Sequence, residues 1–119
     1  MNDVHVVFAP VLTLPTFYFA TNQSSVILSP KVKAQLVADL TRLVRMGVRA
    51  INVNGFADLR SNPAYNRWLS IQRSKAVARY IAQVCRQVGI ATIAVRTKGL
   101  GVTVASANLQ LDRKAVATF

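Results

Sequence analysis

The sequence predicts an α/β fold in which the elements follow the order βαβαββ and two main helices pack on one face of a mixed sheet. Two segments, residues 30–46 and 63–88, each begin with a proline that follows a capping residue, and each is followed by a glycine. Strand-like segments precede, separate and follow these helices. Parallel neighbours need a crossover helix, and the last strand follows the third without one, so we expect a mixed sheet.

The first predicted elements are a strand over residues 17–20, which is rich in aromatic side chains, and the helix that begins at Pro30. Residues 1–15 are expected to be a lead-in strand or linker, and the domain proper is assigned to residues 16–119. Along the helix, apolar residues recur at steps of three and four, which predicts one buried face. This face consists of Val32, Leu36, Val37, Leu40, Leu43 and Val44.

The second half of the chain repeats this pattern. Residues 50–55 alternate between apolar and polar side chains, which is the period of a strand with one buried face. Asn62 and a following proline then open the second helix, and Gly89 ends it. The third strand is predicted over residues 93–96, a turn over residues 98–101 and a final strand over residues 115–119.

The charge balance indicates an anionic partner. Fifteen Lys and Arg residues stand against four Asp and no Glu, which gives a formal net charge of +11. Such an excess attracts nucleic acid, anionic lipid surfaces and acidic wall polymers alike, so it predicts the sign of the partner and not its identity. No apolar run is long enough for a membrane span, and we expect any targeting or anchoring segment to lie outside these residues.

The reactive side chains predict a binding domain that is not an enzyme. One cysteine and one histidine offer no metal-ligand spacing, so no metal or other cofactor is expected, and Cys85 is assigned to the core. Hydrolysis of a polymer would need a general acid and a general base. Four scattered Asp residues provide no evident pair of this kind.

Arg73 is out of place on the second helix. A helical wheel gives an apolar arc formed by Leu69, Val77, Tyr80, Val84 and Val88. A separate basic stripe is formed by Arg67, Lys75, Arg79 and Arg86. Arg73 falls in the middle of the apolar arc, where an unpaired guanidinium would cost several kcal/mol. The position therefore predicts that Arg73 has a specific partner.

Asp58 is the nearest candidate partner, because it lies just past the carboxyl end of the second predicted strand, where ligand sites of α/β sheets gather. One interpretation is a buried ion pair that ties the helix to the loop. The other is a receptor for a zwitterion, in which Asp58 accepts from an ammonium and Arg73 holds a carboxylate in a two-point contact. The pattern alone leaves both open.

A motif in fixed register resembles the OmpA-like, peptidoglycan-binding C-terminal domain family, which includes peptidoglycan-associated lipoproteins and flagellar stator periplasmic domains. The resemblance covers about residues 16–119. Its centre is the segment Gly-Phe-Ala-Asp at residues 55–58, similar to the family's Gly-His-Thr-Asp. At family spacing follow Tyr65, Asn66, Leu69, Ser70, Arg73, Ala76 and Val77. Weaker similarities lie at residues 19–22, 99–101 and 112–114.

The resemblance implies an OmpA-C-like fold and non-covalent binding of peptidoglycan, in which Asp58 and Arg73 hold the diaminopimelate of the stem peptide. It implies a cell-envelope location, facing the periplasm or wall, within an exported or membrane-anchored protein. Anionic wall polymers are expected as further partners through the basic stripe, whereas nucleic acid is not expected. The ligand-binding residues that it implies are Asp58, Arg73, Asn66, Asn22, Phe56, Ala57 and Leu59.

Several positions depart from the family pattern. Phe56 and Ala57 replace a histidine and a threonine, and Ala20 replaces an aspartate, so side-chain hydrogen bonds around the ligand are fewer. Ser61 and Asp112 stand where glycine and asparagine are usual. Backbone amides are expected to remain as donors, and a stem with lysine or with amidated diaminopimelate is an alternative ligand.

A basic nucleic-acid-binding module is the alternative function. It rests on the net charge and on the basic stripe of the second helix. No nucleic-acid-binding fingerprint accompanies them, and most of the aromatic residues that base stacking needs are assigned to core or strand positions.

Overall fold

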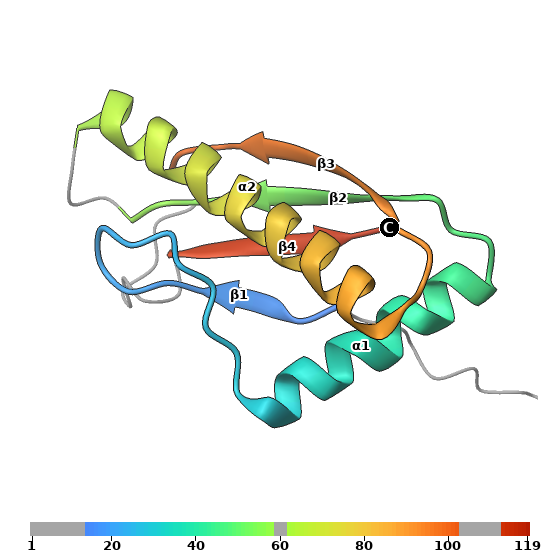
Figure 1. The fold of residues 1–119 in the computed structure, drawn as a ribbon. Helices are drawn as coiled ribbons and strands as arrows, with labels where there is room; N and C mark the ends of the chain where they lie inside the picture. Colours follow the sequence, from blue (N-terminus) through green and yellow to red (C-terminus); the bar gives the residue numbers. More distant parts are fainter. Residues whose placement is uncertain (1–13, 59–61, 103–112) are drawn as a thin grey trace, which may run out of the picture.

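The computed structural model describes residues 14–58, 62–102 and 113–119. Its elements, in chain order, are β1 (Thr16–Tyr18), α1 (Pro30–Arg45), β2 (Ala50–Gly55), α2 (Pro63–Val88), β3 (Ala94–Gly99) and β4 (Lys114–Thr118). The four strands form one sheet in the order β1-β4-β2-β3 (Figure 1). β2 and β3 are parallel, and β4 is antiparallel to both of its neighbours. The predicted βαβαββ order and mixed sheet are confirmed.

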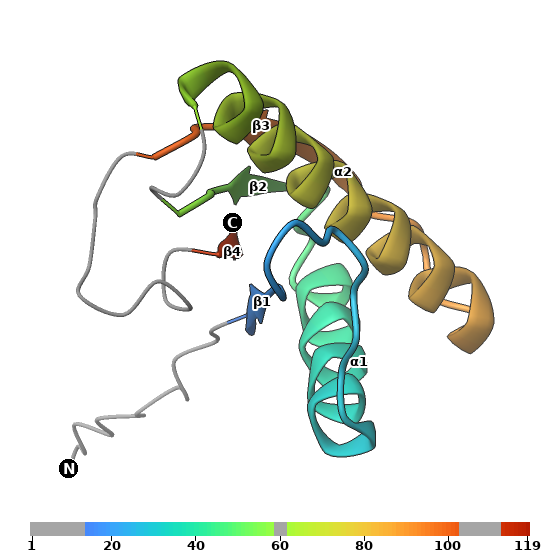
Figure 2. The ribbon, with the colours of Figure 1, turned by 90° about the vertical axis from the view of Figure 1, so that its left-hand side faces the viewer.

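Both helices lie on the same side of the sheet, as predicted (Figure 2). The hydrophobic core fills the space between the helices and the sheet. α1 contributes leucines, β2 contributes Ile51 and Val53, and β4 contributes Ala115 and Ala117 from the face turned toward the helices. The buried side chains of α1 are Leu36, Leu40 and Leu43, which are fully covered, together with Asp39. The alternating period of residues 50–55 thus gives the predicted buried face.

The helix ends follow the predicted capping residues. The Ser29 side chain accepts from the backbone N–H of Val32 at 3.3 Å, and the Asn62 side chain accepts from that of Tyr65 at 2.8 Å. Each cap is followed by a proline, whose missing N–H is one that the first helical turn leaves unpaired. Gly89 closes α2 in the left-handed conformation, with φ 73°.

Several predicted details of the strands and helices are wrong. β1 ends at Tyr18, so residues 19 and 20 of the predicted first strand lie beyond it. Val32, assigned to the buried face of the first helix, is exposed because it lies in the first turn of α1. β3 runs to Gly99, so residues 98 and 99, expected in a turn, belong to the strand and pair with β2. On α2 the buried arc is wider than predicted: Ile81 and Cys85 are fully covered, whereas Val88 is exposed. The buried arc is wide because α2 contacts both the sheet and α1. Val88 is exposed because it is the last residue of α2.

Two glycines set the distance between α2 and the sheet. Gly55 of β2 and Gly99 of β3 are partners in the parallel register. A Cβ atom at position 55 would collide with the backbone carbonyl of Ser70, and one at position 99 with Ile71. The helix backbone therefore lies directly on the strand ends, which positions the following loops against its first turns.

The predicted lead-in segment, residues 1–15, lies outside the described residues apart from its last two positions. Of the helices that the structure describes, none combines the length and the apolar character that crossing a bilayer requires.

We predict that Gly55→Ala lowers the free energy of unfolding by about 3 kcal/mol, because the new methyl group meets backbone that cannot move aside cheaply. Urea denaturation measures this change. Asn52→Ala is the control, since Asn52 lies on the exposed face of the same strand and its loss should change the free energy by less than about 0.5 kcal/mol. Equal stabilities of the two variants would contradict the close approach of α2.

Candidate ligand-binding site

Arg73 is the largest fully buried side chain of the described residues, with 0 % of its surface exposed. Its guanidinium donates three hydrogen bonds to backbone carbonyl oxygens. Nε donates to Gln23 at 3.0 Å, one terminal nitrogen to Phe56 at 3.0 Å, and the other to Ala20 at 3.2 Å. The guanidinium carbon lies 5.2 Å from the centre of the Phe19 ring. Arg73 therefore joins α2 to the loops that follow β1 and β2.

The prediction that a carboxylate is the direct hydrogen-bond partner of Arg73 is wrong. Main-chain carbonyls accept the three hydrogen bonds of Arg73, and Asp58 contributes through its negative charge. Burial lowers the pKa of Arg73 to about 10, while the negative charge of Asp58 opposes that shift. Arg73 consequently stays protonated at neutral pH, although its pKa lies closer to neutral pH than that of an exposed arginine.

Asp58 follows β2 and is itself 8 % exposed. Its Oδ2 forms an ion pair at 3.4 Å with Arg113, which lies next to the start of β4. Arg113 is further fixed because its Nε donates to the Phe19 carbonyl at 2.9 Å. The carboxylate is thereby placed between two arginines, one of which is fully buried.

Asp58 and Arg73 line one cavity of about 190 Å³, which we call the Asp58 cavity. The other lining residues are Thr21, Asn22, Ala57, Tyr65, Asn66 and Leu69. They come from the loop after β1, the loop after β2 and the first turns of α2. One water needs roughly 10–15 Å³ by this measure, so the cavity has room for a small polar group of a ligand.

Most of the predicted site residues meet here. Asn22, Ala57 and Asn66 line the Asp58 cavity beside Asp58 and Arg73. Asn22 adopts a positive φ of 58°, and its Oδ1 accepts from the Tyr65 hydroxyl at 3.3 Å. Leu59 lies outside the described residues.

Phe56 has a different place from the one predicted. Its side chain is not part of the cavity lining, and its ring centre lies 5.6 Å from the Lys114 ammonium. Its backbone carbonyl accepts from Arg73. The residue thus contributes to the site through its main chain.

The expectation that backbone amides here remain as donors for a ligand is wrong for two positions. The N–H of Phe56 donates to the Lys114 carbonyl at 2.8 Å, and that of Ala57 donates to the Gly101 carbonyl at 3.0 Å. Both donors are used within the protein, because the loop after β2 continues to pair with its neighbours. These two amides are therefore not free to donate to a ligand.

Sequence reasoning missed two contributors to the site. Tyr65 lines the cavity, and Arg113 forms the ion pair with Asp58. Both positions lay within segments of the motif, but a motif does not show which of its members face the ligand. Arg113 is separated from Asp58 by 55 positions, and only the antiparallel pairing of β4 with β2 brings them together.

The described residues provide no metal site. Among residues 14–58, 62–102 and 113–119, no group of three or more His, Cys, Asp or Glu side chains could hold an ion. Cys85 is a free, buried thiol in the core, as predicted.

We predict that Arg73→Lys lowers the free energy of unfolding by about 2–4 kcal/mol, because one ammonium cannot reach three carbonyls on separate segments and leaves buried acceptors unpaired. Chemical denaturation of the variant measures the loss. Arg79→Lys on the exposed side of α2 is the matched control and should change stability by less than about 0.5 kcal/mol. If both variants are equally stable, Arg73 does not hold the loops.

Known structures resemble this chain over most of its length, whereas no protein-family model and no curated protein sequence matches it. The peptidoglycan-associated lipoprotein from Burkholderia pseudomallei aligns with a TM-score of 0.66 and 23% identity, over 87% of this chain and 89% of that chain. The OmpA-like domain of FopA1 from Francisella tularensis aligns with a TM-score of 0.60 and 20% identity, over 87% of this chain and 69% of that chain. The cell wall anchor of the T6SS from Pseudomonas aeruginosa aligns with a TM-score of 0.52 and 21% identity, over 87% of this chain and 78% of that chain. The chain therefore has the OmpA-like fold.

Proposed function

We propose that this chain binds peptidoglycan non-covalently through the free end of a diaminopimelate-type residue of the stem peptide. By this contact it anchors a larger protein or envelope component to the wall. The observation that carries the proposal is the Asp58 cavity, which presents one carboxylate and one guanidinium within a space the size of an amino-acid terminus. A free ammonium and a free carboxylate on one carbon complement these two groups.

In this proposal Asp58 accepts hydrogen bonds from the ligand ammonium, and Arg73 attracts the ligand carboxylate. An arginine has five N–H donors, and the three bonds to carbonyls leave two for a ligand. Arg73 is fully covered in this structure, so direct contact requires its cover to shift. The hydrogen bond between Asn22 and Tyr65 joins two lining segments at 3.3 Å in an exposed position and costs little to open.

The fold is consistent with this function but does not establish it, because one fold hosts many functions and the residues of the site determine which one is performed. Two of the similar structures are described as a peptidoglycan-associated lipoprotein and as a cell wall anchor. The motif around Asp58 and Arg73, which the sequence shares with peptidoglycan-binding domains, lies at the cavity. A cell-envelope location follows from the proposal.

The basic stripe gives the protein a second, less specific attraction to anionic wall polymers. Arg67, Lys75, Arg79 and Arg86 are all exposed along α2. Attraction of this kind weakens as salt screens it, whereas the buried charges of the Asp58 cavity are screened much less. A nucleic-acid-binding module remains the alternative, and it predicts binding that depends on the stripe and is indifferent to Asp58.

We predict that Asp58→Asn weakens co-sedimentation with insoluble peptidoglycan at least tenfold, because the variant keeps the shape of the side chain and removes the charge that pairs with an ammonium. The fold should persist, since asparagine can still accept a hydrogen bond from Arg113. Circular dichroism of the same preparation confirms folding before the binding assay.

Asp39→Asn is the control for this experiment. Asp39 is a buried carboxylate like Asp58, with 3 % of its surface exposed, but it lies on α1 and its Oδ1 accepts from Gln35. Both substitutions change the net charge by the same amount, so a general effect of charge would affect both equally. A folded Asp58→Asn variant that binds as well as the Asp39→Asn variant would refute the proposed role of Asp58.

A further inference from the structure

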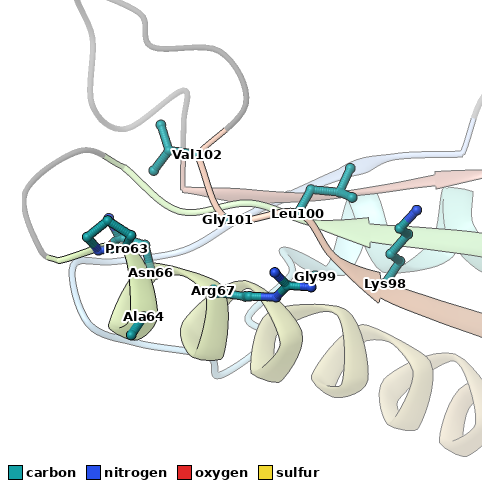
Figure 3. A pocket seen from close by; sticks show the side chains of 9 residues that line it. All are labelled: Pro63, Ala64, Asn66, Arg67, Lys98, Gly99, Leu100, Gly101 and Val102. Carbon is teal, nitrogen blue, oxygen red and sulfur yellow. The ribbon is translucent and has the colours of Figure 1, made fainter.

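A larger hollow adjoins the Asp58 cavity, between the start of α2 and the end of β3. We call it the Arg67 hollow; its volume is about 800 Å³, within the range of about 300–1,000 Å³ that ligand pockets occupy. Its lining consists of Pro63, Ala64, Asn66, Arg67, Lys98, Gly99, Leu100, Gly101 and Val102 (Figure 3). The first four belong to α2 and the others to the end of β3 and the segment after it.

The hollow is positively charged. Among the described residues, Arg67 and Lys98 are its two charged lining residues, and none of the lining residues is an acid. Both side chains are exposed, and neither makes a hydrogen bond or ion pair within the part of the chain that the structure describes, in contrast to Arg73 and Arg113. Figure 3 shows Arg67 extending along α2 toward Gly99, whereas the side chain of Lys98 points away from α2. An anion bound beside α2 would meet the Arg67 guanidinium, which no group of the described residues neutralises.

The hollow and the Asp58 cavity are neighbours that share a wall. Asn66 lines both of them. Ala57 in the wall of the cavity donates its backbone N–H to the carbonyl of Gly101 in the wall of the hollow. Gly101 has a φ of 64° and lies against the backbone of Arg67, where an added Cβ would be 3.8 Å from the Arg67 Cα. A ligand held at Asp58 and Arg73 can therefore extend past Asn66 to Arg67.

We propose that the Arg67 hollow is a second subsite for the same ligand, in which Arg67 binds the free carboxylate of the residue next to the diamino acid. The inference rests on the proposed function. In a stem peptide the diamino acid is linked to the side-chain carboxyl of a glutamate, which leaves the α-carboxyl of that glutamate ionised one residue away. An arginine binds such a group through paired, charge-assisted hydrogen bonds.

The test uses three soluble ligands: free meso-diaminopimelate, the γ-D-glutamyl dipeptide of it, and the same dipeptide with the glutamyl α-carboxyl amidated. Titration calorimetry on the unmodified chain should give roughly tenfold weaker binding for the amidated dipeptide than for the acid. In Arg67→Gln this difference should vanish, while the affinity for free diaminopimelate stays within about twofold.

Arg79→Gln is the matched control, because Arg79 is an exposed arginine of the same helix and is not part of the hollow. It should preserve the preference for the acid. The proposal is overturned if amidation has no effect on the unmodified chain, or if Arg67→Gln weakens free diaminopimelate as much as the dipeptide. It is also overturned if inorganic phosphate saturates the site at Arg67 while amidation has no effect, which indicates a phosphate polymer. Failure of all three ligands to bind refutes the proposed function itself.

Discussion

The buried guanidinium of Arg73 connects parts of the chain that are far apart in sequence. Its three hydrogen bonds reach carbonyls at residues 20, 23 and 56, and its planar face lies near the Phe19 ring. A charge without water around it is stable only when such acceptors are fixed in place. The loops after β1 and β2 are therefore held where their side chains meet the first turns of α2, and the Asp58 cavity is the space left between them.

The approach of α2 to the sheet makes this arrangement possible. Gly55 and Gly99 leave no side chain between the strand ends and the helix, so Arg73 reaches the loops from a helix that lies directly on the sheet. Asp58 then lies near enough to oppose the shift that burial imposes on the pKa of Arg73, and Arg113 holds the carboxylate from the other side. The same contacts that stabilise the domain thus prearrange two opposite charges, which reduces the cost of ordering the site when a ligand binds.

The two interpretations of the Asp58 and Arg73 pair are not exclusive. Arg73 has contacts that a purely structural residue would have, since three carbonyls occupy it. It nevertheless lines a cavity together with a carboxylate. A binding site built on a structural arginine explains why substitution of this residue is expected to affect folding as well as binding, and why Asp58 is the better position at which to separate the two effects.

Local patterns predicted most of the fold. The caps Ser29 and Asn62 mark the helix starts to the residue, because capping is decided by neighbours in sequence. The end of β3 was missed because the glycine at position 99 is typical of a turn, whereas here it is required by the closeness of Ile71. That requirement comes from tertiary packing, which periodicity does not contain.

The candidate site was predicted less completely. An arginine on an apolar arc identifies a buried charge, but not that carbonyls of two loops accept its hydrogen bonds. The ion pair of Asp58 with Arg113 depends on the pairing of β4 with β2, and a single sequence does not specify that register. Phe56 was named as a ligand-binding residue from its motif position alone, and in the structure its ring lies near Lys114 and outside the cavity lining.

The central claim is that the Asp58 cavity recognises an ammonium and a carboxylate together. Its most direct test is titration calorimetry with a stem tripeptide ending in diaminopimelate and with two derivatives, one acetylated on the free ammonium and one amidated on the carboxyl beside it. The account predicts that each modification weakens binding at least tenfold, because each removes a charge-assisted contact. Equal binding of either derivative and the parent tripeptide would contradict it.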